Sequence, residues 1–148
     1  MKRVFQITVF LALIVLVVFS VFYFRSQSVY VERTLFFVEP VAKAVVMEHR
    51  LIAEKHDLEL NVELLIKDEL LGPVLLVRDS VFPEGTKLNH ILLRDGVLYA
   101  DLSPEAMFPS AHSGLNFRDS IRILEKTISF NFPEIKNIVV TIDGSIPN

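Results

Sequence analysis

The longest apolar stretch of the chain lies near its N-terminus. Residues 4–24 contain no charged side chain, and their β-branched and aromatic residues cover every face of a helix. At about 1.5 Å per residue, such a helix reaches roughly 31 Å, the thickness of the hydrocarbon core of a bilayer. The pattern predicts a transmembrane anchor at residues 4–24, a cytoplasmic tail at 1–3 and a juxtamembrane linker at 25–33.

A cleaved signal peptide is the alternative interpretation of this segment. Signal peptides have shorter apolar stretches, of about 7 to 15 residues, and small residues at the cleavage site. Ser26 and Ser28 offer a weak site, and the aromatic residues 22–24 lie just before it. We therefore expect an uncleaved, single-pass anchor in the cytoplasmic membrane.

The next two segments have the patterns of β-strands. Residues 29–38 end in a run of β-branched and aromatic side chains, which Glu39-Pro40 interrupts. Residues 43–53 alternate apolar and polar side chains, which is typical of a half-buried strand. We expect the two segments to pair as a hairpin.

A first helix of the domain is predicted after this hairpin. Apolar residues recur at helical spacing from Val62 to Leu70, and Gly72-Pro73 is a typical helix stop. Either Asp57 or Asn61 can serve as the N-cap. A charge run on this segment, which indicates a solvated face, consists of Glu63, Lys67, Asp68 and Glu69.

A second helix is predicted further along the chain. Asn116, followed three residues later by Asp119, gives the pattern of a helix N-terminus. Asn131 and Pro133 mark its end. The apolar stripe expected to face the core consists of Phe117, Ile121, Leu124 and Ile128.

Three further strands are predicted in the C-terminal half. The apolar runs 88–93 and 97–102 flank Asp95-Gly96, which is the strongest short signal for a hairpin. Residues 138–142 form a final, central strand. Between the hairpin and the second helix, residues 103–114 are rich in proline, serine and glycine and indicate a loop.

The predicted order of elements is β-β-α-β-β-α-β, over a domain at residues 34–148. This order packs most simply as an α+β domain with one mixed sheet and both helices on one face. The length of this part of the chain suits one compact domain rather than two.

Several short motifs of this domain, in this order, resemble the GerMN family, which is named after a spore-germination protein. Each motif alone is common, but their order and spacing together are fairly specific. The likeness runs from about Thr34 to the C-terminus. The motifs are Leu70-Leu71-Gly72-Pro73, Phe82-Pro83-Glu84-Gly85-Thr86, Asp95-Gly96-Val97, Asp101-Leu102-Ser103, Lys126-Thr127-Ile128, Phe132-Pro133-Glu134 and Ile142-Asp143-Gly144.

The resemblance implies a cell-envelope module without known catalysis, similar in shape to the ring-building domains of bacterial secretion and sporulation assemblies. It also implies that the N-terminus lies inside and the domain on the extracytoplasmic side. Charge alone does not decide this orientation, because Lys2 and Arg3 are nearly matched by Arg25 and Arg33. The chain departs from some relatives by its single domain copy and by lacking a cysteine for lipid attachment.

Composition excludes several classes of function. The chain has no cysteine, which rules out disulfides, thiolate metal sites and a thiol nucleophile. Of 15 basic residues, Lys2 and Arg3 precede the apolar stretch, which leaves 13 against 18 acidic residues. The resulting net charge of about −5 repels phosphate backbones, so nucleic acid is not an expected partner.

The candidates for chemistry are weak, and we expect no catalytic residue, cofactor or metal. The sequence contains no P-loop, G-x-S-x-G, H-E-x-x-H or G-x-G-x-x-G motif. Asp101 and Asp143 are a possible acid pair of a hydrolase, but turn and cap roles fit them better. The best set of metal ligands is Glu48, His49, Glu54 and His56, although Glu48 and His49 are expected on opposite faces of a strand.

Four other residues are not expected to take part in catalysis. His90, in a strand, and His112, in a loop, have no partner at motif spacing, and we expect them to be structural or exposed. Met107 and Phe108 lie between two prolines. We expect these two to cap the core, and a contact patch is the alternative.

These observations favour a non-enzymatic interaction or assembly module that binds an envelope protein or a second copy of itself. A module that binds peptidoglycan or another cell-wall glycan is the alternative. Sugar binding uses exposed aromatic side chains, and the absence of tryptophan with only three tyrosines counts against it. A hydrolase is the least favoured function.

Overall fold

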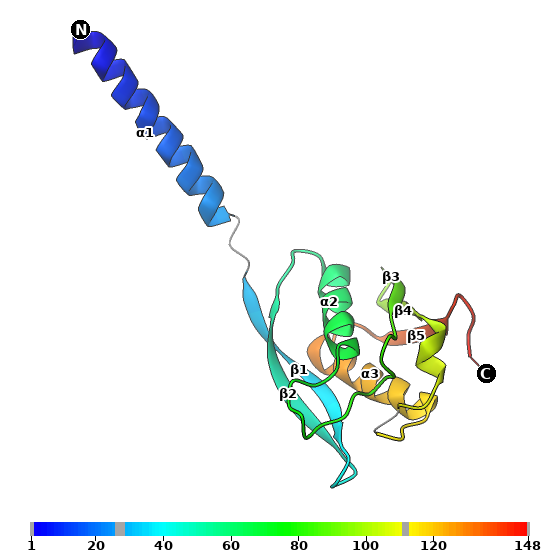
Figure 1. Ribbon diagram of the computed structural model, residues 1–148. Coiled ribbons are helices and arrows are strands. Elements are labelled where there is room, and N and C mark those ends of the chain that lie inside the picture. The colour runs from blue at the N-terminus through cyan, green and yellow to red at the C-terminus, as the bar shows by residue number, and fades with distance from the viewer. Residues whose placement is uncertain (1, 26–28, 111–112, 148) are drawn as a thin grey trace.

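The computed structural model describes residues 2–25, 29–110 and 113–147 (Figure 1). The helices are α1 (Lys2–Arg25), α2 (Leu58–Leu70) and α3 (Phe117–Asn131), with a short 3₁₀ helix at Pro104–Met107. The strands are β1 (Tyr30–Glu39), β2 (Ala44–Ala53), β3 (Leu88–Arg94), β4 (Val97–Leu102) and β5 (Asn137–Ile142). From β1 onward this order is the predicted one, with a 3₁₀ turn added in the predicted loop.

Helix α1 covers the N-terminal apolar stretch, and almost all of its described side chains are exposed. A helix that spans a membrane needs about 20 apolar residues in a row. Within the described ranges, no helix is both long enough and apolar enough to cross a bilayer. The predicted transmembrane anchor, and the single-pass location in the cytoplasmic membrane with the N-terminus inside, are therefore wrong. The alternative cleavage site at Ser26 and Ser28 lies outside the described residues.

Strands β1 and β2 form the predicted antiparallel hairpin. Their register is continuous, from Tyr30 opposite Ala53 to Glu39 opposite Ala44. In β1, residues 34–38 are all buried. They lack the alternation of buried and exposed side chains that is typical of a strand with one solvent-exposed face. Both faces of β1 are therefore covered at this point, whereas β2 keeps an alternating pattern.

The edge of β1 that faces away from β2 is bonded to side chains of α3. Asn131 accepts a hydrogen bond from the Thr34 amide (3.0 Å) and donates one to the Thr34 carbonyl (2.6 Å). The Thr127 hydroxyl accepts from the Phe36 amide (3.3 Å). Further along, the Val38 amide and carbonyl bond to the backbone of Asp79. Two helical side chains thus take the place of a neighbouring strand.

The second sheet has three strands in the order β3-β4-β5. Strands β3 and β4 are antiparallel and turn at Asp95 and Gly96, whose φ angles of 53° and 77° fit a type I′ hairpin. Strand β5 runs parallel to β4, and α3 forms part of the crossover between them. The predicted hairpin and the final strand are confirmed, although β5 lies at an edge of the sheet rather than at its centre.

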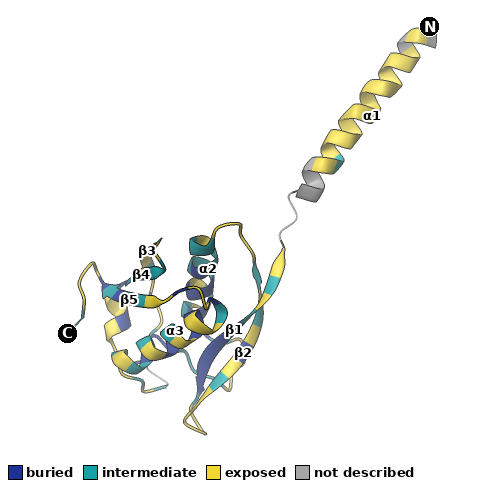
Figure 2. Ribbon diagram, turned by 180° about the vertical axis from the view of Figure 1, so that it is seen from behind, coloured by how far each residue is buried: buried dark blue, intermediate teal, exposed yellow. Residues whose placement is uncertain are grey.

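The prediction of one mixed sheet is wrong, because the hairpin and the three-stranded sheet are separate. Helices α2 and α3 lie between them, which is visible from both sides (Figures 1 and 2). The side chains of α3 occupy the β1 edge that a strand of the other sheet would need. The core between the layers includes Leu35, Phe37, Val62, Leu65, Leu98, Leu102, Leu124 and Ile128.

The ends of α2 and α3 follow from local sequence. The Asp57 side chain accepts from the Glu59 amide, and the Asn116 side chain accepts from the Asp119 amide, so both are N-caps. After α2, Gly72 has φ +84°, and a Cβ there would lie 2.5 Å from the Ser80 hydroxyl oxygen. Glycine is therefore favoured at this turn by its backbone conformation, whereas the Ser80 hydroxyl can rotate away from an added Cβ.

Replacing Asn131 with alanine tests the bond between α3 and the β1 edge. The substitution removes three side-chain hydrogen bonds and leaves the Thr34 amide without a partner. We expect the free energy of unfolding to fall by about 1–3 kcal/mol. Urea unfolding of the full chain, followed by circular dichroism, measures this loss. Asn137→Ala, at an exposed position that begins β5, is the matched control and should change stability by less than about 0.5 kcal/mol.

Candidate interaction surface

The two carboxylates considered as an acid pair, Asp101 and Asp143, line one open hollow of about 560 Å³. Asp101 accepts hydrogen bonds from the Thr141 hydroxyl (2.6 Å), the Gly144 amide (2.8 Å) and the Asn89 amide group (3.2 Å). The bond from Thr141 is the main reason that the pKa of Asp101 lies below its ordinary value. A general acid needs a raised pKa, so this geometry suits a carboxylate that holds the turn after β5.

The other residues of this hollow come from the turn after β5 and from strand β3. Asp143 is exposed and occupies a left-handed conformation at φ 48°. His90 is exposed on β3 and lines the same hollow, in agreement with the prediction for it. The loop residue His112 lies outside the described residues.

The structure does not bring the predicted metal ligands together. Glu48 is buried on the face of β2 that points to the core, whereas His49 lies on the opposite face beside the Thr34 hydroxyl (3.1 Å) and Glu32 (3.5 Å). Across the ranges that the structure describes, no group of three or more ligand side chains is arranged to hold a metal ion.

Glu48 is instead the centre of a partly buried ion network. Arg50 donates to one carboxylate oxygen through two nitrogens (2.8 and 2.6 Å), and Arg78 donates to the other (2.9 Å). The Val74 amide adds a fourth hydrogen bond at 3.1 Å. Burial by itself raises the pKa of Glu48, but the bonds from Arg50, Val74 and Arg78 outweigh it and leave this pKa below its ordinary value.

Arg50 also ties β2 to the end of α2. Its guanidinium donates to the Asp68 carboxylate (3.0 Å) and carbonyl (3.1 Å), and to the Gly72 carbonyl (2.6 Å). It also lies over the Phe37 ring, 5.2 Å from the centroid. The cation thus binds carbonyl groups at a helix C-terminus, where positive charge is favourable. As a result, the segment after α2 is fixed against β2.

The charge run predicted to be a solvated face of α2 divides into three environments. The exposed Lys67 pairs with the half-buried Glu63, with the ammonium 2.6 Å from the carboxylate. Asp68 binds Arg50, as described above. Glu69 is only 1% exposed, and neither of its carboxylate oxygens has a hydrogen-bond partner among the described residues. For Glu69, therefore, the prediction of a solvated face is wrong.

Burial raises the pKa of Glu69 well above its ordinary value. The nearby Thr127 hydroxyl and Arg50 lower it in part, whereas Asp68 raises it. A buried carboxyl without partners is costly as an anion, because its charge loses the solvation of water. Glu69 is therefore a titratable group held inside the core between α2 and α3.

The segment fixed by the ion network carries an exposed apolar surface, which we call the apolar ridge. Its members are Leu71, Val74, Leu75, Leu76 and Val77. All five are exposed, and Leu76 is as accessible as in an extended chain. The pattern of residues 74–77 predicts neither a helix nor a strand. The signal in the sequence for an exposed surface here is four consecutive apolar residues directly after a helix stop.

A groove of about 420 Å³ runs between the apolar ridge and β2, and we call it the edge groove. Residues from both sides line it, with Val74 and Leu75 from the ridge and Met47 and His49 from the strand. The ion network of Glu48, Arg50 and Arg78 completes the lining. The groove therefore lies along the edge of β2 that is not paired with β1.

Met107 and Phe108 do not cap the core as expected. Their side chains are 53% and 64% exposed, and the neighbouring Ala106 is the residue buried at this point. The alternative interpretation, a contact patch, fits this exposure. The 3₁₀ turn at Pro104–Met107 reverses the chain here and directs Ala106 inward.

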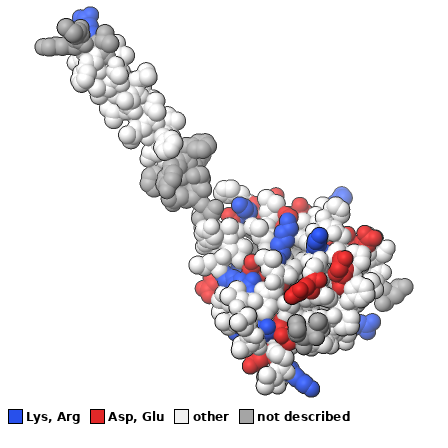
Figure 3. Space-filling view, viewed as in Figure 1, with Lys and Arg blue, Asp and Glu red and all other residues white. Residues whose placement is uncertain are grey.

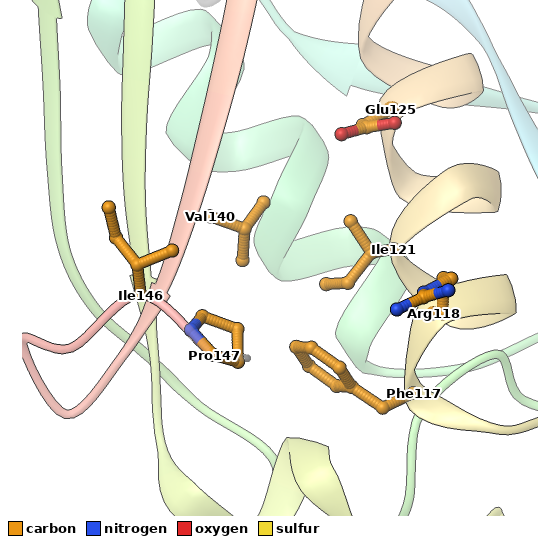
Figure 4. Close-up of a pocket in the computed structure, with 7 residues that line it drawn as sticks. All are labelled: Phe117, Arg118, Ile121, Glu125, Val140, Ile146 and Pro147. Carbon is orange, nitrogen blue, oxygen red and sulfur yellow. The ribbon is translucent and has the colours of Figure 1, made fainter.

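A smaller pocket lies between α3, β5 and the C-terminal segment (Figure 4). Phe117, Ile121 and Val140 point into it, and Ile146 and Pro147 close one side. Its volume of about 210 Å³ is below the range of about 300–1,000 Å³ that is usual for small-molecule sites. The pocket is therefore smaller than a typical metabolite site. It also explains why Phe117 and Ile121, predicted for the core stripe, are only half-buried.

Comparison with known families gives one match that covers most of the chain. Residues 21–146 match the Germane family model, whose description is sporulation and spore germination. Among curated proteins, none matches this chain.

Several solved structures resemble the fold. A candidate lipoprotein of Clostridium perfringens is 20% identical, with a TM-score of 0.50 over 81% of this chain and 80% of that one. The first GerMN domain of the sporulation protein GerM of Bacillus subtilis is 19% identical, with a TM-score of 0.57 over 79% and 86% of the two chains. The tandem GerMN domains of the same protein are 14% identical, with a TM-score of 0.57 over 78% of this chain and 40% of that one.

Replacing Glu69 with glutamine tests the buried carboxyl. Because the pKa of Glu69 is raised in the folded state, its protonation stabilises the fold at acidic pH, and this stabilisation is lost as the pH rises through the folded pKa. We expect Glu69→Gln to be more stable than the unmodified chain by about 1–3 kcal/mol at pH 8. The difference should shrink as the pH falls toward the ordinary value of 4.5.

Urea unfolding at a series of pH values between 4.5 and 8 measures this difference. Glu63→Gln, on the same helix but ion-paired with Lys67 at the surface, is the matched control and should gain no stability as the pH rises. A stability difference for Glu69→Gln that stays constant with pH would contradict the assignment of a raised pKa.

Proposed function

The chain belongs to the Germane family of sporulation and spore-germination domains, and from this premise we propose that it is a non-catalytic protein-interaction domain of the cell envelope. Its partner is an envelope protein or a second copy of the chain. The apolar ridge, Leu71 with residues 74–77, is the observation that carries this proposal.

The apolar ridge has the properties of a contact surface. Contiguous apolar side chains on a folded surface are unfavourable in water and mark sites where a partner binds. The ridge is also held in place at both ends of residues 74–77. The Val74 amide at one end and Arg78, just past the other end, both donate hydrogen bonds to the Glu48 carboxylate. A surface ordered before binding loses less conformational entropy when the partner docks.

The titratable groups support a role without catalysis. Asp101, the best placed of the surface carboxylates considered above, uses its oxygens to hold the turn after β5 and has a lowered pKa. Glu69 has a raised pKa, which is typical of general acids, but it is fully buried and lines none of the hollows described above. Neither group is therefore both accessible and poised for proton transfer.

Surface charge is consistent with a protein partner. On the face shown in Figure 3, acidic and basic side chains are interspersed rather than gathered into one basic area. Nucleic-acid binding relies on continuous lysine and arginine surfaces that neutralise phosphates. We therefore propose a protein, rather than a nucleic acid, as the partner.

Binding of a cell-wall glycan is a second candidate function, and one specific observation favours it. Tyr99 is 44% exposed on the open face of the three-stranded sheet. On the same face, two residues along β4, Asp101 lines the polar hollow together with Asn89 and His90. An exposed ring beside polar side chains suits sugar binding, in which the ring stacks on the sugar and the polar groups bind its hydroxyls.

Site-specific photo-crosslinking tests the proposed function. A photoreactive amino acid at Leu76, the most exposed residue of the apolar ridge, should give a discrete crosslinked protein species in cells. The same group at Glu84, an exposed turn residue, is the matched control and should give none. Equal labelling at the two positions would refute the ridge as a contact surface.

Retention of the purified chain by insoluble peptidoglycan tests the second candidate. We expect no retention if the chain is a protein-interaction domain. Retention that Tyr99→Ala abolishes, together with the absence of crosslinks at Leu76, would establish glycan binding in its place.

A further inference from the structure

We propose that Glu69 is a pH-sensitive switch for the apolar ridge. While its carboxyl group is neutral, the last turn of α2 stays fixed against β2 and the ridge stays ordered. When the carboxyl group ionises, the helix end and the ridge are released. The inference rests on the proposed function and deepens it, because it names a condition that regulates the same contact surface.

The Glu69 side chain is buried where a negative charge is not stabilised. The residue is 1% exposed, and neither carboxylate oxygen has a hydrogen-bond partner among the described residues. An ionised carboxylate in such a place loses the solvation of water and must gain a partner or move. Ionisation of Glu69 therefore requires a change in the structure around it. The raised pKa that burial gives this group agrees with the geometry.

Two charged groups act on Glu69, and neither pairs with it as the structure stands. Asp68, its neighbour on α2, carries the same sign of charge. Arg50 of β2 carries the opposite sign, but a guanidinium has five N–H groups, and all of them are used. Two donate to Glu48, two to Asp68 and one to the Gly72 carbonyl. Arg50 can therefore bind an ionised Glu69 only by giving up one of these bonds.

The other elements packed against α2 offer Glu69 little compensation. On the side of α3 it faces the neutral Thr127 hydroxyl, which already accepts a hydrogen bond from the backbone of β1. The β1 side chain beside Arg50 is the apolar ring of Phe37. Strand β3 binds the first turn of α2 instead, where the Glu59 carboxylate accepts from the Leu93 amide. One hydroxyl group does not replace the solvation of a full charge.

The last turn of α2 couples Glu69 to the apolar ridge. Arg50 binds this turn at Asp68 and at Gly72, on both sides of Glu69 in the chain. The Glu69 carbonyl also accepts a hydrogen bond from the Gly72 amide (3.0 Å). The ridge begins at Leu71, within the same turn. Ionised Glu69 can take a bond from Arg50 or move toward water, and either response disturbs the turn from which the ridge extends.

The direction of the switch follows from the burial of the carboxyl group. Burial holds the pKa of Glu69 well above its ordinary value of 4.5, so the neutral form favours the closed arrangement. Ordering of the ridge is therefore present at acidic pH and is lost as the pH rises through the folded pKa. Partner binding should weaken in the same direction, because a disordered surface loses more conformational entropy when it docks.

Hydrogen exchange of the Gly72 and Val74 amides tests the switch. Both amides are bonded in the closed arrangement, to the Glu69 carbonyl and to the Glu48 carboxylate. Glu69→Gln keeps the side chain neutral at every pH. At pH 8 we expect both amides to exchange at least about tenfold faster in the unmodified chain than in this variant, and at pH 5 equally fast. Glu63→Gln, on the same helix, is the matched control and should exchange like the unmodified chain.

Amides of β4 separate a local release from a change in overall stability. Strand β4 is the central strand of its sheet, so its amides exchange when the whole domain unfolds. We expect Glu69→Gln to change the exchange of Gly72 and Val74 by a larger factor than that of β4. The same factor at all these amides would overturn the inference, because Glu69 would then act on overall stability alone.

A second measurement needs no variant. In methyl NMR spectra of the unmodified chain, the signals of Val74 and Leu75 should shift with the same pH midpoint as the carboxyl carbon of Glu69. His49 lines the edge groove too, and any shift that it causes would remain in Glu69→Gln. Titration of Glu69 with methyl signals that stay fixed would overturn the inference.

Failure of the switch and failure of the proposed function give different results. Crosslinks at Leu76 that are equally strong at pH 5 and pH 8 would keep the contact surface and reject the switch. Release of the ridge at pH 8 without crosslinks at Leu76 at either pH would support the switch and reject the proposed function.

Discussion

The structure depends on the way α3 completes the outer edge of β1. A strand edge buried in a core must have its amides and carbonyls bonded, since each unpaired group costs free energy. Asn131 and Thr127 supply these bonds from a helix, through side chains instead of a backbone ladder. This arrangement separates the hairpin from the three-stranded sheet, because no strand can occupy the same edge. It also determines which edge of the hairpin stays open, namely that of β2.

The ion network around Glu48 performs a related task on the other side of the hairpin. Arg50 binds Glu48, Asp68 and the Gly72 carbonyl at once, so a strand, a helix end and the following segment share one cation. Partly buried ion pairs contribute little net stability, because the loss of hydration offsets their attraction. Their effect here is positional, since they hold the apolar ridge in one place beside the edge groove. Glu69, buried nearby with no hydrogen-bond partner among the described residues, makes this region sensitive to protonation.

The features that could be predicted from the sequence are those whose physical cause is local. Asp95-Gly96 predicted a tight hairpin because both positions need positive φ, and Asn116 predicted a helix start because its side chain can bond the Asp119 amide. The motif order was enough to identify the family. Less of the candidate site could be predicted from the sequence. Asp101 was correctly interpreted as a turn residue, whereas the apolar ridge and the burial of Glu69 were missed, because both depend on contacts with β2 and α3.

By itself, then, the sequence determined the family, the order of strands and helices, the turns and the absence of thiol chemistry. Each of these depends on residues that are close together in the chain or on composition alone. Tertiary structure decided that there are two sheets rather than one, that Glu48 and Arg50 bind the end of α2, and that β2 has the open edge. These outcomes depend on side chains from segments far apart in sequence that compete for the same backbone groups. The result of that competition cannot be predicted from a local sequence pattern.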